Sequence, residues 1–271
     1  MEALSISKED FCKAAGIGNS PFSGLASFFM RILKINAFNQ MMADAKSLKG
    51  VAFTDHLLKT LGVTLVIDEA DLLNIPQDGA FVSISNHPYG AIESLALLSI
   101  LVKKRPETMF MGNFLLKKVP NLADHIIAVN PFENIKDSSS ISGLKTTLSV
   151  LKQGTPVAIF PAGEVSNYCL KQKQITDKEW HPVVGKIIKK ADQPVLPVYF
   201  HGNNGLWFSL MRYIHPSLQT ILLFSQLFNK KGHRLQIKIG RPITPSAIPE
   251  TDNIQLLGYL REKIYEMGTN L

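Results

Sequence analysis

The chain has 271 residues, of which 45% are hydrophobic, and Lys and Arg outnumber Asp and Glu by 29 to 22. This apolar content is enough for a sizeable core and excludes a chain that is disordered throughout. Two cysteines without a CxxC spacing argue against a disulfide framework or a zinc site. No run approaches about 18 uncharged apolar residues, so a membrane-spanning helix is not expected, and the N-terminus lacks the apolar core of a signal peptide.

The first part of the chain is predicted to be helical. Residues 20–61 favour helix, with Ser20-Pro21 as a start signal and Gly62 as a stop. Residues 63–68 and 80–86 then predict two strands, separated by the turn sequence IPQDG. A helix over 93–104 follows and is closed by basic residues and Pro106.

The rest of the chain alternates strands and helices. Helices are predicted over 143–154 and 254–268, and apolar strands over 108–112, 126–130, 156–160, 194–200 and 235–240. Such alternation predicts crossover connections. The expected fold class is α/β, with a largely parallel central sheet flanked by helices and preceded by an N-terminal helical segment. We divide the chain into that segment (1–62) and an α/β domain (63–271).

The sequence SISNHPYGAIESLALL, residues 83–98, places an ionisable ring and a carboxylate where a strand turns into a helix. In parallel sheets the loops that leave the carboxyl ends of strands usually build the site. An imidazole can take and return a proton near neutral pH, and Glu93 could fix the tautomer of His87. Alternatively, Glu93 is a helix-start residue favoured by the helix dipole, and His87 is structural.

Two further strand ends carry polar residues. AIFPAGEVSN (158–167) runs from a buried strand into a Pro-Ala-Gly turn whose backbone N–H groups could hold an anion or oxyanion, with Glu164 and Ser166 nearby. A plain turn is the alternative. PVLPVYFHGNNG (194–205) ends in His201 and Asn203, which are possible contacts or ordinary loop residues.

Together these stretches resemble a known family. NHPYGAIES and FPAGEVS are similar to the NHxxxxD-type and FPEGTRS-type blocks of the glycerolipid acyltransferases that acylate lysophosphatidic acid. PVLPVYFHG resembles a later strand of that family, and NFLLKKVPNLADHIIAVN hints at its middle block. The likeness covers roughly residues 80–205 in the expected order.

The resemblance implies an acyltransferase domain in which His87 is the general base and Glu93 its orienting acid. It implies transfer of a fatty acyl group from acyl-carrier protein or acyl-CoA to a lipid hydroxyl, with no cofactor and no metal. The residues it places at the substrate are Asn86, Gly90, Lys117, Lys118, Phe160, Pro161, Gly163, Glu164 and Ser166.

The departures from the family pattern concern the acceptor. The acid is a Glu six residues after the histidine rather than five, and Ala162 replaces an acidic residue. Val165 and Asn130 stand where the family has basic residues that are thought to grip a phosphate. These forms look closer to a hemolysin-like bacterial branch that includes aminolipid O-acyltransferases, so a lyso-aminolipid is the favoured acceptor and lysophosphatidic acid the next.

Direct acyl transfer needs no enzyme nucleophile. His87 would deprotonate the acceptor hydroxyl, and N–H groups around Gly163 or the His87 turn could hold the oxyanion. The sequence lacks GxSxG, HExxH and the P-loop pattern. A non-catalytic lipid- or acyl-carrier-binding module on the same fold is the competing reading.

The substrates implied are amphiphiles, so we expect the protein at a membrane surface, peripheral on the cytoplasmic face of the inner membrane. The segments 21–42 and 213–234 combine apolar and basic residues and could be interfacial or core helices. The net charge of +7 also suits nucleic acid, but no recognition motif supports that class, and no nucleic-acid partner is expected.

Overall fold

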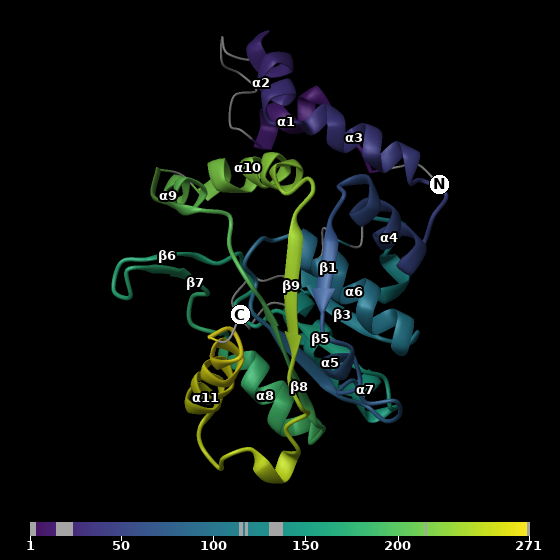
Figure 1. The fold of residues 1–271 in the computed structure, drawn as a ribbon, viewed down its shortest axis with the longest axis vertical. Helices are drawn as coiled ribbons and strands as arrows, with labels where there is room; N and C mark the ends of the chain where they lie inside the picture. Colours follow the sequence, from purple (N-terminus) through teal and green to yellow (C-terminus); the bar gives the residue numbers. More distant parts are fainter. Residues whose placement is uncertain are drawn as a thin grey trace.

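A computed structural model describes residues 4–14, 24–113, 116, 119–129, 138–214 and 216–269. Its centre is a seven-stranded sheet in the order β1-β9-β8-β2-β5-β3-β4 (Figure 1). Its strands are β1 (Thr64–Ile67), β2 (Val82–Ser85), β3 (Met109–Asn113), β4 (Ile126–Val129), β5 (Val157–Ile159), β8 (Val195–Phe200) and β9 (Arg234–Ile239). Five neighbouring strands, from β8 to β4, are parallel, and β9 and β1 run the other way. The predicted α/β class with a largely parallel sheet is therefore confirmed.

Helices cover both faces of this sheet. One face is covered by the contacting pair α4 (Gly50–Thr60) and α6 (Ile92–Lys104), and the other by α7 (Ser138–Lys152), α8 (Pro182–Ala191) and α11 (Asn253–Glu266). The side chains of a strand point alternately to the two layers. In β5, Ala158 belongs to the α4/α6 layer, whereas Val157 and Ile159 belong to the other. Because both faces of the sheet are buried, the sequences of the parallel strands are continuous apolar runs.

The N-terminal segment forms several short helices rather than one long helix. They are α1 (Lys8–Ala14), α2 (Ala26–Ile32), α3 (Ile35–Asp44) and α4. Lys34 breaks the run between α2 and α3 with a left-handed backbone, at φ 59°. Met41, Met42 and Phe53 pack into the same apolar cluster as α6 and β8, so the C-terminal half of this segment shares the core of the α/β part.

Several described elements were not predicted. They include the helices α1, α5 (Glu69–Leu72) and α8, and the antiparallel hairpin of β6 (Asn167–Cys169) and β7 (Gln174–Thr176). Two more helices, α9 (Leu206–Ile214) and α10 (Pro216–Asn229), follow β8 and connect it to β9. Across all the described ranges, no helix is both long and apolar enough to cross a bilayer.

Candidate active site

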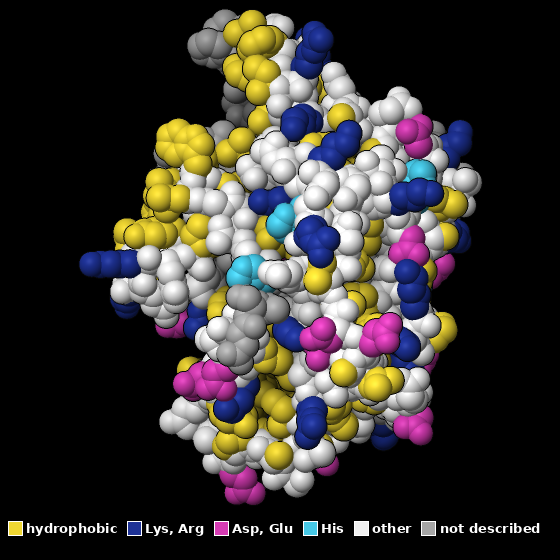
Figure 2. All heavy atoms as spheres, viewed as in Figure 1, with side chains coloured by type: hydrophobic (Ala, Val, Ile, Leu, Met, Phe, Trp, Pro, Cys, Tyr) yellow, Lys and Arg dark blue, Asp and Glu magenta, His cyan; other side chains and the backbone are white. Residues whose placement is uncertain are grey.

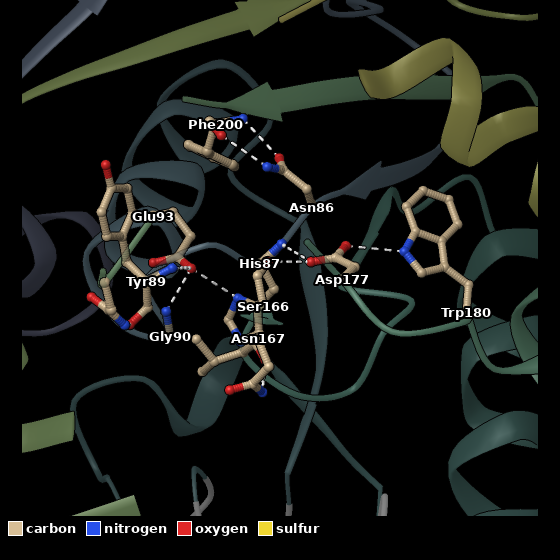
Figure 3. Close-up of polar contacts among 12 residues, drawn as sticks. Asn86, His87, Tyr89, Gly90, Glu93, Ser166, Asn167, Asp177, Trp180 and Phe200 are labelled. Atoms are coloured by element: carbon tan, nitrogen blue, oxygen red, sulfur yellow. Dashed lines mark hydrogen bonds and ion pairs between the residues drawn. The ribbon is translucent and has the colours of Figure 1, made fainter. Parts of the chain in front are cut away.

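Two loops leave the carboxyl ends of the neighbouring parallel strands β2 and β5 and meet at one edge of the sheet. The first, residues 86–91, leads from β2 into α6, and the second, residues 160–166, leads from β5 into the β6–β7 hairpin. Ser166 joins the two, because its N–H donates to the His87 carbonyl at 2.8 Å. The structure thus brings His87, Glu93 and the FPAGEVS stretch together, as the sequence predicted (Figure 3).

Asn86 fixes the start of the first loop. Its side-chain amide donates to the Phe200 carbonyl and accepts from the Phe200 N–H, both at 2.8 Å. This pair of hydrogen bonds holds the end of β2 against the end of β8. Both polar atoms of the buried amide are engaged in this way, so Asn86 acts in the structure as a clamp between two strands.

His87 and Glu93 form the pair that the sequence suggested. The distance between His87 Nδ1 and Glu93 Oε1 is 3.0 Å, and 14% of the His87 side chain is exposed whereas the Glu93 side chain is fully buried. The spacing is that of an ion pair, although the ring N–H is not aligned with Oε1 as in a regular hydrogen bond. With Nδ1 facing Glu93, Nε2 lies on the other side of the ring.

Glu93 also shapes the backbone of the loop that carries His87. Its Oε1 accepts from the Tyr89 N–H at 2.7 Å and from the Gly90 N–H at 2.6 Å. Burial raises the pKa of the Glu93 carboxyl, but the His87 imidazole and the two N–H groups outweigh burial and hold that pKa below its ordinary value. Glu93 is therefore a carboxylate at neutral pH.

Gly90 allows the turn to close. Its φ is +91°, and a Cβ at this position would lie 2.6 Å from the Val165 side chain and 3.1 Å from Leu223. Only glycine combines this backbone with so close an approach. Gly90 is thus required for packing the first loop against the second.

Phe160 supports the imidazole from the second loop. Its ring is stacked on that of His87, with centroids 4.2 Å apart and planes inclined at 30°. The His87 ring therefore contacts the Glu93 carboxylate at Nδ1 and the Phe160 ring at its face, and both contacts restrict its rotation. Phe160, predicted as a substrate contact, touches the general-base candidate directly.

Asp177 contacts both loops of the site and was not predicted from the sequence. Its Oδ1 accepts from the His87 N–H at 3.1 Å and from the Ser166 hydroxyl at 2.5 Å, and its Oδ2 accepts from the Trp180 ring N–H at 3.0 Å. Figure 3 shows Glu93 and Asp177 on opposite sides of His87. Asp177 lies 90 residues after His87, directly beyond the unpredicted hairpin, and no local pattern links the two residues.

The remaining groups of the second loop are engaged in its own structure. The Gly163 N–H donates to the Phe160 carbonyl at 3.0 Å, and the Pro161 carbonyl accepts from the His181 N–H at 3.0 Å. The Glu164 carboxylate contacts Arg212 of α9 at 2.7 Å and Lys178 at 3.2 Å. The N–H group suggested for an oxyanion is thus used in a turn, and Glu164 connects the loop to α9.

A second group that the sequence analysis did not recognise surrounds Tyr89. The Tyr89 hydroxyl donates to the His201 carbonyl at 2.8 Å and lies 3.1 Å from His233 Nε2, while Lys230 Nζ lies 4.9 Å from the centre of the ring. Burial, followed by the charge of Glu93, raises the pKa of the Tyr89 hydroxyl, which therefore stays protonated. His201 contributes its backbone here.

Other sequence predictions lie elsewhere. Asn203 Oδ1 accepts from the Gly205 N–H at 2.7 Å within its own loop. Lys117, Lys118 and Asn130 lie outside the described residues. Within the described part of the chain, no group of three or more His, Cys, Asp or Glu side chains is placed to hold a metal ion.

The site thus combines a half-buried imidazole, a buried carboxylate facing one ring nitrogen, and a loop braced on both sides. Comparison with known proteins identifies the class: residues 15–270 match the pattern of a family described as acyltransferase. The chain belongs to this family and is an acyltransferase.

Individual relatives are distant but cover most of the chain. The lyso-glycine lipid O-acyltransferase of Phocaeicola vulgatus is 23% identical over 253 residues, which cover 90% of this chain and 87% of that protein. The protein of the same name from Bacteroides thetaiotaomicron is 22% identical over 256 residues, covering 90% and 89%. Among solved structures, the 1-acyl-sn-glycerophosphate (LPA) acyltransferase PlsC from Thermotoga maritima aligns with a TM-score of 0.49 and 18% identity, over 90% of this chain and 93% of that one.

Proposed function

We propose that this acyltransferase moves a fatty acyl group from a thioester to the hydroxyl of a lyso-lipid, with His87 as general base. The observation that carries the proposal is the 3.0 Å contact of His87 Nδ1 with the fully buried Glu93 carboxylate. A buried anion on one ring nitrogen stabilises the protonated ring that forms when the other nitrogen accepts a proton. The proposal needs no cofactor besides the acyl thioester.

The reaction would run in two proton transfers. His87 Nε2 takes the proton of the acceptor hydroxyl while the hydroxyl oxygen attacks the thioester carbonyl carbon. The tetrahedral intermediate then collapses, the carbon–sulfur bond breaks, and the thiolate leaves with the proton from His87. Glu93 stays ionised throughout and compensates the charge of the imidazolium.

Fixed geometry is the second contribution of this chain. The His87 ring touches Glu93 and Phe160, and the His87 N–H is held by Asp177. A base held in one orientation avoids an ordering cost when the substrates bind. We infer that the hydrogen bonds of Asn86 with Phe200 and of Asp177 with the His87 N–H hold the base in this orientation.

We further propose that the acceptor is a lyso-aminolipid whose head group carries a carboxylate. Val165 stands where a phosphate-gripping Arg would be expected, and two cations of the described residues beside this loop, Arg212 and Lys178, are paired with Glu164. Such a setting suits one carboxylate better than a phosphate dianion, whose burial without a set of Arg partners is costly. The names of the two relatives from Phocaeicola vulgatus and Bacteroides thetaiotaomicron, both lyso-glycine lipid O-acyltransferases, support the same class.

The donor and the location are parts of the same proposal. Acyl-carrier protein and coenzyme A both present the acyl group on an anionic carrier, and a net charge of +7 favours their approach. Both donors belong to the cytoplasm, so we place the enzyme on the cytoplasmic face of the inner membrane. Peripheral attachment there would give access to the lyso-lipid.

The acceptor is tested by a side-by-side assay with one acyl donor, comparing lyso-glycine lipid with lysophosphatidic acid. We expect the higher kcat/KM for the lyso-glycine lipid. A higher value for lysophosphatidic acid would overturn the aminolipid proposal and indicate phospholipid synthesis. Acyl-CoA and acyl-carrier protein are then compared with the better acceptor.

The sequence also allowed a non-catalytic lipid-binding module on the same fold, but membership of the acyltransferase family favours an enzyme. Such a module would bind lyso-lipid without forming an ester. Wild-type protein that binds lyso-lipid but yields no new ester with either donor would contradict the proposed reaction. The contact between His87 and Glu93 supports catalysis, because a carboxylate facing one nitrogen of an imidazole is the arrangement of a general base and its orienting acid.

A further inference from the structure

Several large apolar side chains of this protein lie outside its core and along one edge. They belong to α2 and its cap, to α9, and to the tip of the β6–β7 hairpin: Leu25, Phe28, Phe29, Ile32, Leu206, Trp207, Tyr213 and Leu170. We call this set the apolar edge. Figure 1 shows the three elements along the same upper-left side of the molecule, and Figure 2 shows hydrophobic side chains gathered over them.

The exposure of these side chains is not explained by packing within the chain. Trp207 is 76% exposed, whereas Phe208, the next residue of α9, is 2% exposed and anchors the helix. Leu170, at the tip of the hairpin, is 68% exposed. Burying such groups in water-excluding surroundings is favourable, and a patch assembled from three elements indicates an interaction surface.

The charge pattern indicates which partner fits the apolar edge. Residues 24–43, 165–176 and 193–249, which contain the three elements, include no Asp or Glu. They do include exposed cations close to the apolar side chains, among them Arg31, Lys171 and Lys173. Within these ranges the charged residues beside the apolar side chains are cations, which matches the head-group boundary of an anionic bilayer.

The apolar edge is also connected to the candidate active site. The hairpin begins at Asn167, directly after Ser166 of the second loop. Helix α9 is tied to that loop by the contact of Arg212 with Glu164, and to the hairpin by the Tyr213 hydroxyl, which donates to the Tyr168 carbonyl at 2.9 Å. A membrane bound at this edge would therefore lie next to the loops that carry His87 and Phe160.

We propose that the apolar edge, formed by α2, α9 and the hairpin tip, inserts into the interface of an anionic membrane. The inference rests on the proposed function for its purpose, which is delivery of the lyso-lipid, and on the described surface for its location. It places α9 at the bilayer rather than α10, whose described side chains from Leu222 to Phe228 are buried or half-buried. Of the segment 213–234 suggested by the sequence, Tyr213 belongs to the apolar edge.

The two tryptophans of the chain make this testable. Trp207 is on the apolar edge, whereas Trp180 is buried and its ring N–H donates a hydrogen bond to Asp177. The full-length protein is mixed, without acyl donor or acceptor, with vesicles of phosphatidylcholine alone or with phosphatidylglycerol added. We expect a blue shift and quenching by brominated acyl chains on the anionic vesicles, and loss of both in Trp207→Phe.

Substitutions on and off the apolar edge complete the test. Trp207→Ser with Leu170→Ser should weaken binding to the anionic vesicles by at least about tenfold, since each side chain loses its insertion into the apolar layer. Ile254→Ser and Leu73→Ser serve as controls, because both residues are strongly exposed but lie on other elements. They should bind as the wild type does.

Unchanged vesicle binding of the double variant, or Trp207 fluorescence that brominated lipids do not quench, would overturn the proposal. Concentration-dependent dimerisation of the wild type, abolished in the double variant and without vesicle binding, would also overturn it, because it would show that a second copy covers the edge. Turnover with a short-chain, water-soluble acceptor tests the proposed function separately. Loss of vesicle binding alone contradicts only the membrane inference.

Discussion

The two loops at the site differ in what their side chains do. The loop after β2 carries His87, and Glu93 directs its carboxylate at the His87 ring and at the backbone of that loop. The loop after β5 contributes a ring face and an anchored hydroxyl, and its Glu164 points away to α9. In the proposed mechanism the first loop therefore supplies the general base, and the second loop supports it. Substitutions in the two loops should therefore have effects of different size.

The largest effect is expected at His87. His87→Ala removes the general base, which typically costs about 10² to 10⁴-fold in rate, and leaves the fold intact because the backbone of the loop is held by Glu93 and Asp177. Steady-state turnover measures the loss of rate, and circular dichroism checks that the fold is intact. A folded His87→Ala protein with turnover near the wild-type level would contradict the role of His87.

Glu93→Gln should come next, with kcat lowered by roughly 10²-fold, because the amide keeps the shape but loses the charge opposite the imidazolium. The comparison is made at saturating substrate, so that a change in kcat is separated from one in KM. Activity within about twofold of the wild type would reduce Glu93 to a residue that only shapes the turn.

Glu93→Gln should also change how the free energy of unfolding depends on pH. Because the pKa of Glu93 is lowered in the folded state, its carboxylate stabilises the fold above the unfolded-state pKa, and this contribution is lost as the pH falls through the folded-state value. The free energy of unfolding of the wild type minus that of Glu93→Gln should therefore be larger at pH 7 than in acid. Denaturant titrations at both pH values measure it, and a difference independent of pH would contradict the ionised state of Glu93.

Asp177 belongs to neither loop but braces both, so its effect should be intermediate. Asp177→Asn weakens the contacts with the His87 N–H and the Ser166 hydroxyl, and misplacement of the base should lower kcat by about tenfold. As a positioning residue, it should leave the pH dependence of kcat unchanged in shape. A shifted pH profile would show that Asp177 acts on the proton transfer itself.

The smallest effect is expected in the supporting loop. Phe160→Leu removes the ring stacked on His87, a contact worth about 1 kcal/mol, and should reduce kcat about fivefold. Phe160→Tyr keeps the ring and is the matched control, with activity close to the wild type. A loss as large as that of His87→Ala would mean that the second loop takes part in the chemistry.

Local patterns predicted the sheet and suggested that His87 and Glu93 lie close together, whereas their roles came from the family resemblance. Continuous apolar strands alternating with helices indicate a parallel sheet, and His87 and Glu93 lie within one strand–turn–helix unit. Their separation of six residues is closed by the turn at Gly90, which brings the carboxylate back to the ring. Pairs joined by one turn can be predicted from sequence.

Contacts that depend on the fold could not be predicted in this way. Asp177 reaches the His87 N–H across 90 residues, and the amide of Asn86 bonds to a strand 114 residues away. The periodicity of an amphipathic helix is the same whether its apolar face meets a core or a membrane. Hence α10, with described side chains buried or half-buried from Leu222 to Phe228, and α9, with an exposed Trp207, could not be told apart in advance.

Direct transfer, with His87 as a base and without an acyl-enzyme, can be tested by measuring the mass of the intact protein. Wild-type enzyme is mixed with acyl thioester alone and quenched rapidly before its mass is measured, and a parallel sample receives the lyso-lipid as well. We expect an unmodified protein mass in both samples and ester product only in the second. A protein heavier by one acyl group, with the adduct on Ser166 and lost in Ser166→Ala, would contradict it.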